Sequence, residues 1–168
     1  MLRAMARPRS VPDETVHEAV LSLIRGKGEK AVTFSAVAAR AGLAASSLAE
    51  RHGSVAGMIS DARKGIWDRI EMATAAAIAV AGPGPKGAVA LLKALASAGV
   101  PPVTADPARA AIWRARVEAE LALRLGGGSR GRESAALLFA VWQGQVLWQP
   151  AGDKTVRLKD AVRRLTSD

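Results

Sequence analysis

Few side chains in this 168-residue sequence could act as an acid, a base, a nucleophile or a metal ligand. Cysteine is absent, which excludes a thiolate nucleophile and a cysteine-based zinc site, and the two histidines, His17 and His52, are few for a metal centre. The glycine-rich stretch 126–128 lies between predicted helices, and the sequence contains no P-loop, HExxH motif or nucleophile elbow. We therefore expect no enzymatic activity, no metal and no cofactor.

Positive charge is the remaining chemical feature, and its distribution singles out the N-terminal tail. A formal net charge of +9 favours a polyanionic partner. The tail carries Arg3, Arg7 and Arg9 and no acidic residue, whereas five basic and five acidic residues balance between Ser10 and Gly57. The tail is the clearer candidate for binding a polyanion, and the alternative is a merely solvated end of the chain.

Composition and apolar spacing predict an all-α protein. Hydrophobic residues make up 49% of the chain and aromatic residues 4%, with alanine predominant, which favours helices and excludes an all-β fold. The predicted N-terminal elements are a helix from Ser10 or Asp13 to residues 26–28, a short helix over 34–41 capped by Thr33 and ended by Gly42, and a second short helix over 45–51.

A long helix and four further helices are predicted in the remainder of the chain. Ser54 is a plausible N-cap for a helix of about 25 residues that ends at the glycine–proline run 82–85. Further breaks at 99–102 with Pro107, at 126–131 and at 150–152 separate the rest into helical segments. The segment 132–149 has apolar residues on two faces, more than one core contact can cover.

A short helix, a glycine turn and a second short helix form the arrangement that places the second helix in the DNA major groove. The segment VTFSAVAARAGLAASSLAERHGS, residues 32–54, resembles the DNA-binding domain of the tetracycline-repressor (TetR) family, and the resemblance covers residues 16–66. The family's typical residues are present at Val32, Thr33, Ala38, Ala39, Arg40, Ala41, Gly42, Leu48, Gly53 and Ser54, with conservative matches at Leu43 and Met58.

The resemblance implies a basic tail over 1–12, a three-helix DNA-binding domain over 13–57, and a ligand-binding and dimerisation domain over 58–168. The recognition helix departs from the family at positions that contact DNA. Ala49 replaces a phosphate-contacting tyrosine, Val55 replaces a lysine, Ala44 and Ala45 replace a polar or basic pair, and Glu50 adds a negative charge. Fewer cationic contacts predict weaker binding with a smaller salt dependence.

The remaining candidates for DNA contact are small hydroxyls, the alanine that begins the recognition helix, and basic side chains. They are Thr33, Ser35, Ala45, Ser46, Ser47, Arg51 and His52, with Arg3, Arg7 and Arg9 in the tail. The tail could enter the adjacent minor groove. For His52 we favour a half-buried position under the turn, with phosphate contact as the alternative.

The resemblance also implies an effector pocket and a dimer interface in the C-terminal part. Candidate pocket residues are Trp67, Met72, Leu91, Leu95, Trp113, Val117, Phe139 and Trp142, although aromatic residues at helical spacing are also typical of a core. Apolar side chains that one core cannot cover are candidates for the dimer interface, namely Leu137, Val141, Trp148, Leu158, Val162 and Leu165.

The sequence thus predicts a homodimeric, ligand-responsive transcriptional repressor that binds double-stranded DNA at a palindromic operator. One alternative is a TetR-like protein without autonomous DNA binding that acts as a heterodimer partner or antirepressor. Another is a small-molecule-binding protein with no role on DNA. We expect a cytoplasmic protein with no membrane partner, because the most apolar run, 72–81, has about half of the roughly 20 residues needed to span a bilayer.

Overall fold

The computed structural model describes residues 11–98, 103–152 and 156–167, and the regular elements among them are all helical. The fold class is all-α, as the composition predicts. The chain divides into an N-terminal unit that ends at Trp67 and a C-terminal unit that begins at Asp68. No helix in the described ranges combines the length and the apolar character that a bilayer crossing demands.

The helices of the N-terminal unit begin and end where local signals predict. They are α1 (Asp13–Lys27), α2 (Phe34–Ala41) and α3 (Ala45–His52), with a single 3₁₀ turn, η1 (Glu29–Ala31), after α1. The Thr33 hydroxyl accepts a hydrogen bond from the Ala36 N–H at 3.1 Å, which caps α2. Gly42, with a φ of 69°, ends α2 in the left-handed conformation that glycine adopts without strain.

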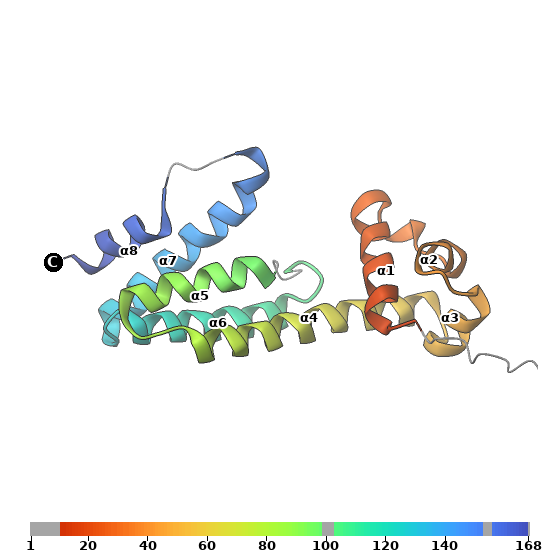
Figure 1. Ribbon diagram of the computed structural model, residues 1–168, viewed down its shortest axis with the longest axis horizontal. Coiled ribbons are helices and arrows are strands. Elements are labelled where there is room, and N and C mark those ends of the chain that lie inside the picture. The colour runs from red at the N-terminus through yellow and green to blue at the C-terminus, as the bar shows by residue number, and fades with distance from the viewer. Residues whose placement is uncertain (1–10, 99–102, 153–155, 168) are drawn as a thin grey trace, which may run out of the picture. The chain divides into compact units, whose positions relative to one another are not determined.

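Three helices and the start of a fourth enclose the core of the N-terminal unit (Figure 1). The fourth is α4 (Val55–Val80), and the Ser54 hydroxyl caps it by accepting a hydrogen bond from the Gly57 N–H at 3.0 Å, as predicted. Met58, Ile59 and Ala62 of α4 are buried in the same core as α1, α2 and α3. For this reason the N-terminal unit extends to Trp67 instead of ending at residue 57.

The C-terminal unit consists of the rest of α4 and four further helices, α5 (Gly84–Ala98), α6 (Pro107–Arg124), α7 (Gly128–Trp148) and α8 (Leu158–Thr166). Helix α6 packs against α5 and α7, and α8 packs against α5 and α7 (Figure 1). Helix α7 begins before the predicted residue 132, because the Gly131 N–H already donates to the Gly127 carbonyl at 2.8 Å. A 3₁₀ turn, η2 (Gln149–Ala151), follows α7.

Polar contacts join α6 to the part of α4 that lies in the C-terminal unit. The Arg109 guanidinium contacts Glu71 at 2.7 Å and Asp68 at 2.8 Å. The hydrogen bond from Arg109 lowers the pKa of the Glu71 carboxyl, and the hydrogen bonds to Glu71 and Asp68 raise the pKa of Arg109. One turn further along α6, the Trp113 indole N–H donates to the buried Thr74 hydroxyl at 2.8 Å.

We expect Gly87→Ala to lower the free energy of unfolding of the C-terminal unit by about 2 kcal/mol. A Cβ at this buried position of α5 would overlap the backbone carbonyl of Gly82, so the backbone itself would have to move. Gly144→Ala on α7 is the control, because a Cβ there meets no atom within 4 Å. Its better helix propensity should stabilise the protein by about 0.5–1 kcal/mol in urea denaturation. Equal effects of the two changes would contradict the overlap.

Candidate nucleic-acid interface

Helices α2 and α3 form a helix-turn-helix whose inner sides are buried and whose outer sides are exposed. Val37, Ala38 and Ala41 of α2 and Leu48 of α3 are buried in the core of the N-terminal unit. Ser46 and Ser47, in the first turn of α3, are exposed, whereas Ala45 is half-buried against the core. The first turn of α3 therefore presents two hydroxyls to solvent.

The hydroxyls at the start of α2 are also exposed. The Thr33 Oγ1 atom accepts the capping hydrogen bond and keeps its own proton for donation, and Ser35 lies in the first turn of α2. Exposed hydroxyl donors at the start of a helix suit phosphate oxygens, since the N-terminal end of a helix is electropositive. This end of α2 and the first turn of α3 are thus the parts of the unit that are chemically suited to DNA.

Arg51 does not present a free guanidinium. Its Nη1 atom donates to the Asp13 carboxylate at 2.8 Å and to the Val11 carbonyl at 3.3 Å, so the side chain ties the end of α3 to the start of α1. Contact between Arg51 and a phosphate would require this ion pair to break or to be shared. The Asp13 carboxylate would therefore compete with a DNA phosphate for the Arg51 guanidinium.

His52 packs inside the unit, which corrects its assignment to DNA contact. Its side chain is only 4% exposed, and its Nδ1 atom lies 2.7 Å from the Asp61 carboxylate on α4. The other ring nitrogen, Nε2, is buried and has no hydrogen-bond partner among the described residues. Of the two predicted positions for His52, the structure confirms the one under the turn between α3 and α4.

The described part of the N-terminal unit carries little net charge. Residues 11–67 contain seven basic and six acidic residues. Several of the basic residues have partners within the unit: Arg63 contacts Glu29 at 2.5 Å and Arg40 donates to the Ser22 hydroxyl at 3.0 Å. The predicted tail contacts at Arg3, Arg7 and Arg9 lie outside the described residues.

The candidate effector residues of the C-terminal unit form a packed aromatic cluster. Trp113, Phe139 and Trp142 are buried, with ring centroids 5.5–6.4 Å apart. Leu91, Leu95 and Val117 are buried as well. Trp142 Nε1 has no acceptor among the described residues, which leaves one buried donor in this cluster.

Two other candidate effector residues do not belong to that cluster. Met72 is 71% exposed, and Trp67 is buried at the last position of the N-terminal unit. The sequence pattern grouped them with Trp113 and Trp142 because all are large apolar residues on helices. Helical spacing alone does not tell which unit or which side of α4 a residue faces.

The second apolar face of α7 is exposed, as its two-sided pattern predicts. Leu137 and Trp148 are 51% and 57% exposed. The other candidates for the dimer interface are more buried: Val141, Leu158 and Leu165 are half-buried, and Val162 is only 3% exposed. Val162 is therefore corrected from an interface residue to a core residue of its own chain.

Three arginines beside this face are not among the residues that the sequence predicts for a site. Arg157, Arg163 and Arg164 of α8 and its N-cap line a pocket together with Leu137 and Val141 of α7. The spacing of Arg157 and Arg164 in the sequence could have indicated a shared basic surface, because residues seven apart in a helical segment share a face.

No protein-family model matches the chain, and no curated protein sequence matches it.

Proposed function

We propose that this chain is a DNA-binding transcriptional regulator of the TetR type, a repressor that binds a palindromic operator as a homodimer. The observation that carries this proposal is the helix-turn-helix, with Leu48 seating α3 in the core while Ser46 and Ser47 face solvent. An α-helix with one exposed side of small residues fits the major groove. Such a regulator would act in the cytoplasm and would need neither a catalytic centre nor a cofactor.

Each hydroxyl has a distinct role in this proposal. Ser46 and Ser47 would meet base edges, because the first turn of a recognition helix enters the groove most deeply. Thr33 and Ser35 would donate to phosphates and set the position of the domain on the duplex. The tail arginines would supply the positive charge that residues 11–67 lack.

Dimerisation and effector binding would depend on the C-terminal unit. The exposed apolar face of α7, with Leu137 and Trp148, is the surface that a second copy would cover. An effector would act through α4, since this helix belongs to both units. It must bind one conformation more tightly than the other to shift the spacing of the two recognition helices.

A second function is favoured by the lack of a free cation on the recognition helix. Glu50 is exposed, Ala49 offers no polar group, and Arg51 is paired with Asp13. A TetR-like protein with this surface could have lost autonomous DNA binding and could act instead as a heterodimer partner or antirepressor. The two functions differ in whether the pure protein binds a specific duplex.

Fluorescence anisotropy with duplexes from the protein's own upstream region, at two salt concentrations and with excess nonspecific competitor, tests the proposal. We expect specific binding that weakens with salt.

Removal of residues 1–9 should reduce the slope of log affinity against log salt by about 2 to 4, because a dimer loses six arginines of which some contact phosphate. If no duplex is bound while Ala49→Tyr/Val55→Lys creates binding, the heterodimer partner is the better description.

We expect Ser46→Ala or Ser47→Ala to cost about 1 kcal/mol of discrimination between operator and mutated operator. Both hydroxyls are exposed, so neither change should unfold the domain. Glu50→Gln is a matched control, because it alters an exposed side chain of the same helix without removing a hydroxyl. It should strengthen binding to all sequences alike. Uniformly weaker binding in the serine variants would show that these hydroxyls only position the protein.

A further inference from the structure

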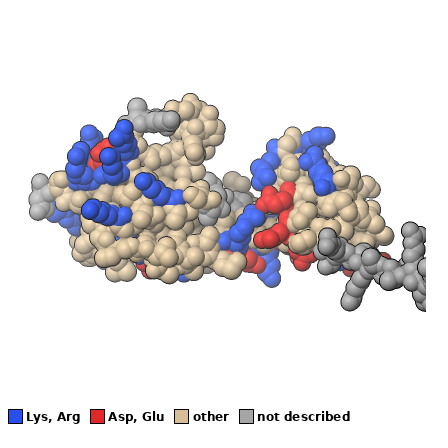
Figure 2. All heavy atoms as spheres, in the orientation of Figure 1, with Lys and Arg blue, Asp and Glu red and all other residues tan. Residues whose placement is uncertain are grey.

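The positive charge of the C-terminal unit is concentrated on two neighbouring helices, α5 and α8. These helices and the N-cap of α8 carry six basic residues and one acidic residue, namely Lys86, Lys93, Arg157, Lys159, Arg163 and Arg164 against Asp160. The other described residues of the unit include seven basic and six acidic residues. Figure 2 shows basic residues gathered over α8 around one acidic residue. A surface with such an excess of one charge favours an anionic ligand.

A groove of about 350 Å³ lies between α5 and α8, within this basic surface. Its volume falls in the range of roughly 300–1,000 Å³ that is typical of small-molecule sites. Pro85 and Val89 of α5 and Val162 of α8 contribute apolar side chains, while Lys86 and Lys159 contribute one ammonium group from each helix. Val162 is buried and Val89 is half-buried, whereas both lysines are exposed. The groove thus combines an apolar floor with a basic rim.

Neither of these two lysines is neutralised within the chain. Lys86 and Lys159 have no carboxylate partner among the described residues, and Asp160, the acidic residue of α8, contacts Arg163 at 3.6 Å. An ammonium group is a compact charge with three donors, whereas the planar guanidinium group matches a planar carboxylate. Two ammonium groups from different helices therefore suit the tetrahedral oxygens of a phosphate.

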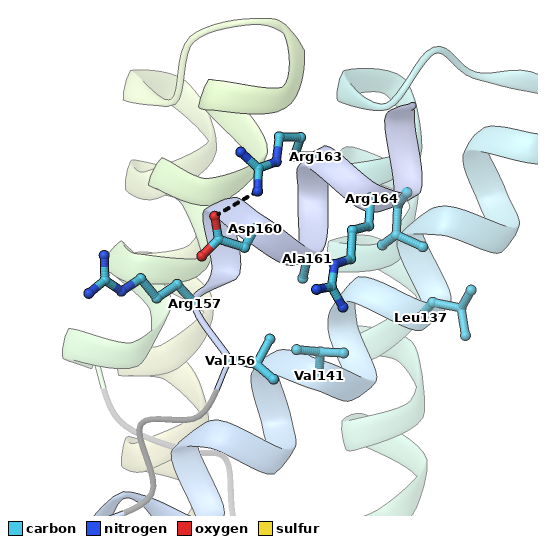
Figure 3. Close-up of a pocket in the computed structure, with 9 residues that line it drawn as sticks. Leu137, Val141, Val156, Arg157, Asp160, Ala161, Arg163 and Arg164 are labelled. Carbon is cyan, nitrogen blue, oxygen red and sulfur yellow. Dashed lines mark ion pairs between the residues drawn. The ribbon is translucent and has the colours of Figure 1, made fainter. Parts of the chain in front are cut away.

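The groove lies on the opposite side of α8 from the α7 face that the proposed dimer covers. Lys159 and Val162 line the groove together with α5, whereas Ala161 and Arg164 line the pocket beside α7. Lys159 and Ala161 point in nearly opposite directions, because residues two apart lie about 200° apart around a helix axis. Figure 3 shows the Arg164 side chain extending toward Val141 of α7. No described residue of α7 lines the groove, so a second copy that covers α7 would leave it accessible.

We propose that the groove between α5 and α8 binds a phosphate monoester with a small apolar body. The phosphate would lie between the ammonium groups of Lys86 and Lys159, and the apolar body would cover Pro85, Val89 and Val162. A monoester carries close to two negative charges at pH 7, which matches the two lysines. The site is separate from the helix-turn-helix and its test contains no DNA, so its failure is distinguishable from failure of the proposed function.

Isothermal titration of the full chain with phenyl phosphate tests the proposal. We expect saturable binding with a Kd below about 1 mM that weakens as salt is added. Phenyl sulfate has a similar shape but a single negative charge, inorganic phosphate lacks the apolar body, and benzyl alcohol lacks the charge, so each should bind more weakly. Absence of saturable phenyl phosphate binding, or equally tight binding of inorganic phosphate, overturns the proposal.

Phosphate monoesters also occur as lipid headgroups, so vesicles that contain phosphatidate form a separate arm, with pure phosphatidylcholine vesicles as the reference. Binding of phenyl phosphate alone would support a free ester as the ligand. Binding of both, with phenyl phosphate displacing the vesicles, would support the same site with a lipid headgroup as the source. Binding of phosphatidate vesicles without binding of phenyl phosphate would overturn the proposal in favour of a membrane surface.

Variants locate the site. Lys86→Gln/Lys159→Gln should reduce phenyl phosphate affinity at least about tenfold, since hydrogen bonds to a charged group are lost. Val89→Gln should also weaken binding while leaving the charge unchanged. Lys93→Gln/Arg132→Gln removes two exposed cations of the same unit that lie outside the groove, so it is the matched control and should bind as the unchanged protein does. Equal affinity of the two double variants overturns the proposal. Circular dichroism checks that each variant is folded.

Discussion

Leu48→Ala is expected to lower the free energy of unfolding of the N-terminal unit by about 3 to 4 kcal/mol. Leu48 is fully buried and packs α3 against the apolar core of the unit. Its truncation removes apolar burial and leaves a cavity beneath α3. A change of this size is a large fraction of the stability of a small unit.

Hydrogen exchange measured by mass spectrometry can assign that loss to the correct unit. Amides of α1, α2 and α3 should exchange faster in Leu48→Ala, whereas those of α6 and α7 should keep their protection. Operator affinity should fall as well, because α3 would no longer be held in place. Ser47→Ala, on the neighbouring exposed position, should change stability by less than about 0.5 kcal/mol. Similar exchange in the two variants would show that Leu48 does not anchor α3.

Arg124→Met is expected to destabilise the C-terminal unit by about 3 kcal/mol. Arg124 is the last residue of α6, and its side chain is 10% exposed. Its guanidinium donates to the Ile78 and Ala81 carbonyls at 3.3 Å each and to the Gly82 carbonyl at 3.2 Å. The last turn of α4 has no basic residue of its own, so Arg124 supplies donors to carbonyls at its end.

The same side chain also contacts the Glu120 carboxylate at 2.6 Å, so methionine would leave this acid without its partner. Arg124→Lys keeps the charge but lacks the planar fork, and we expect it to recover about half of the loss. Arg116→Met, at an exposed position of the same helix, is the control and should cost less than about 0.5 kcal/mol. Urea denaturation followed by circular dichroism compares the three variants. Equal midpoints for Arg124→Met and Arg116→Met would contradict a capping role.

Local hydrogen bonding and backbone conformation made the N-terminal helices predictable from the sequence. Thr33 and Ala36 are three residues apart and form a cap, and Gly42 adopts a positive φ that other residues avoid. Ser54 caps α4 in the same way. Each of these interactions lies within one turn of helix, so neighbouring residue types are sufficient to predict them.

The state of the candidate DNA contacts depends on residues distant in the sequence. Arg51 is neutralised by Asp13 at the start of α1, and His52 is buried beside Asp61 of α4. The spacing of residues along α3 shows that both lie in its last turn but says nothing of these partners. Only the tertiary contacts of α3 with Asp13 of α1 and Asp61 of α4 determine that Arg51 and His52 both have acidic partners.

The sequence by itself determined the all-α class, the helix-turn-helix and the two apolar faces of α7, because each follows from residue type and spacing within one segment. The tertiary structure alone decided that Val162 is a core residue, that Arg124 caps α4, and that Arg157 and Arg164 lie beside Val141 in one pocket. The physical reason is the range of the interactions. Helix formation depends on near neighbours along the chain, whereas burial, long-range hydrogen bonds and pockets depend on which helices pack together.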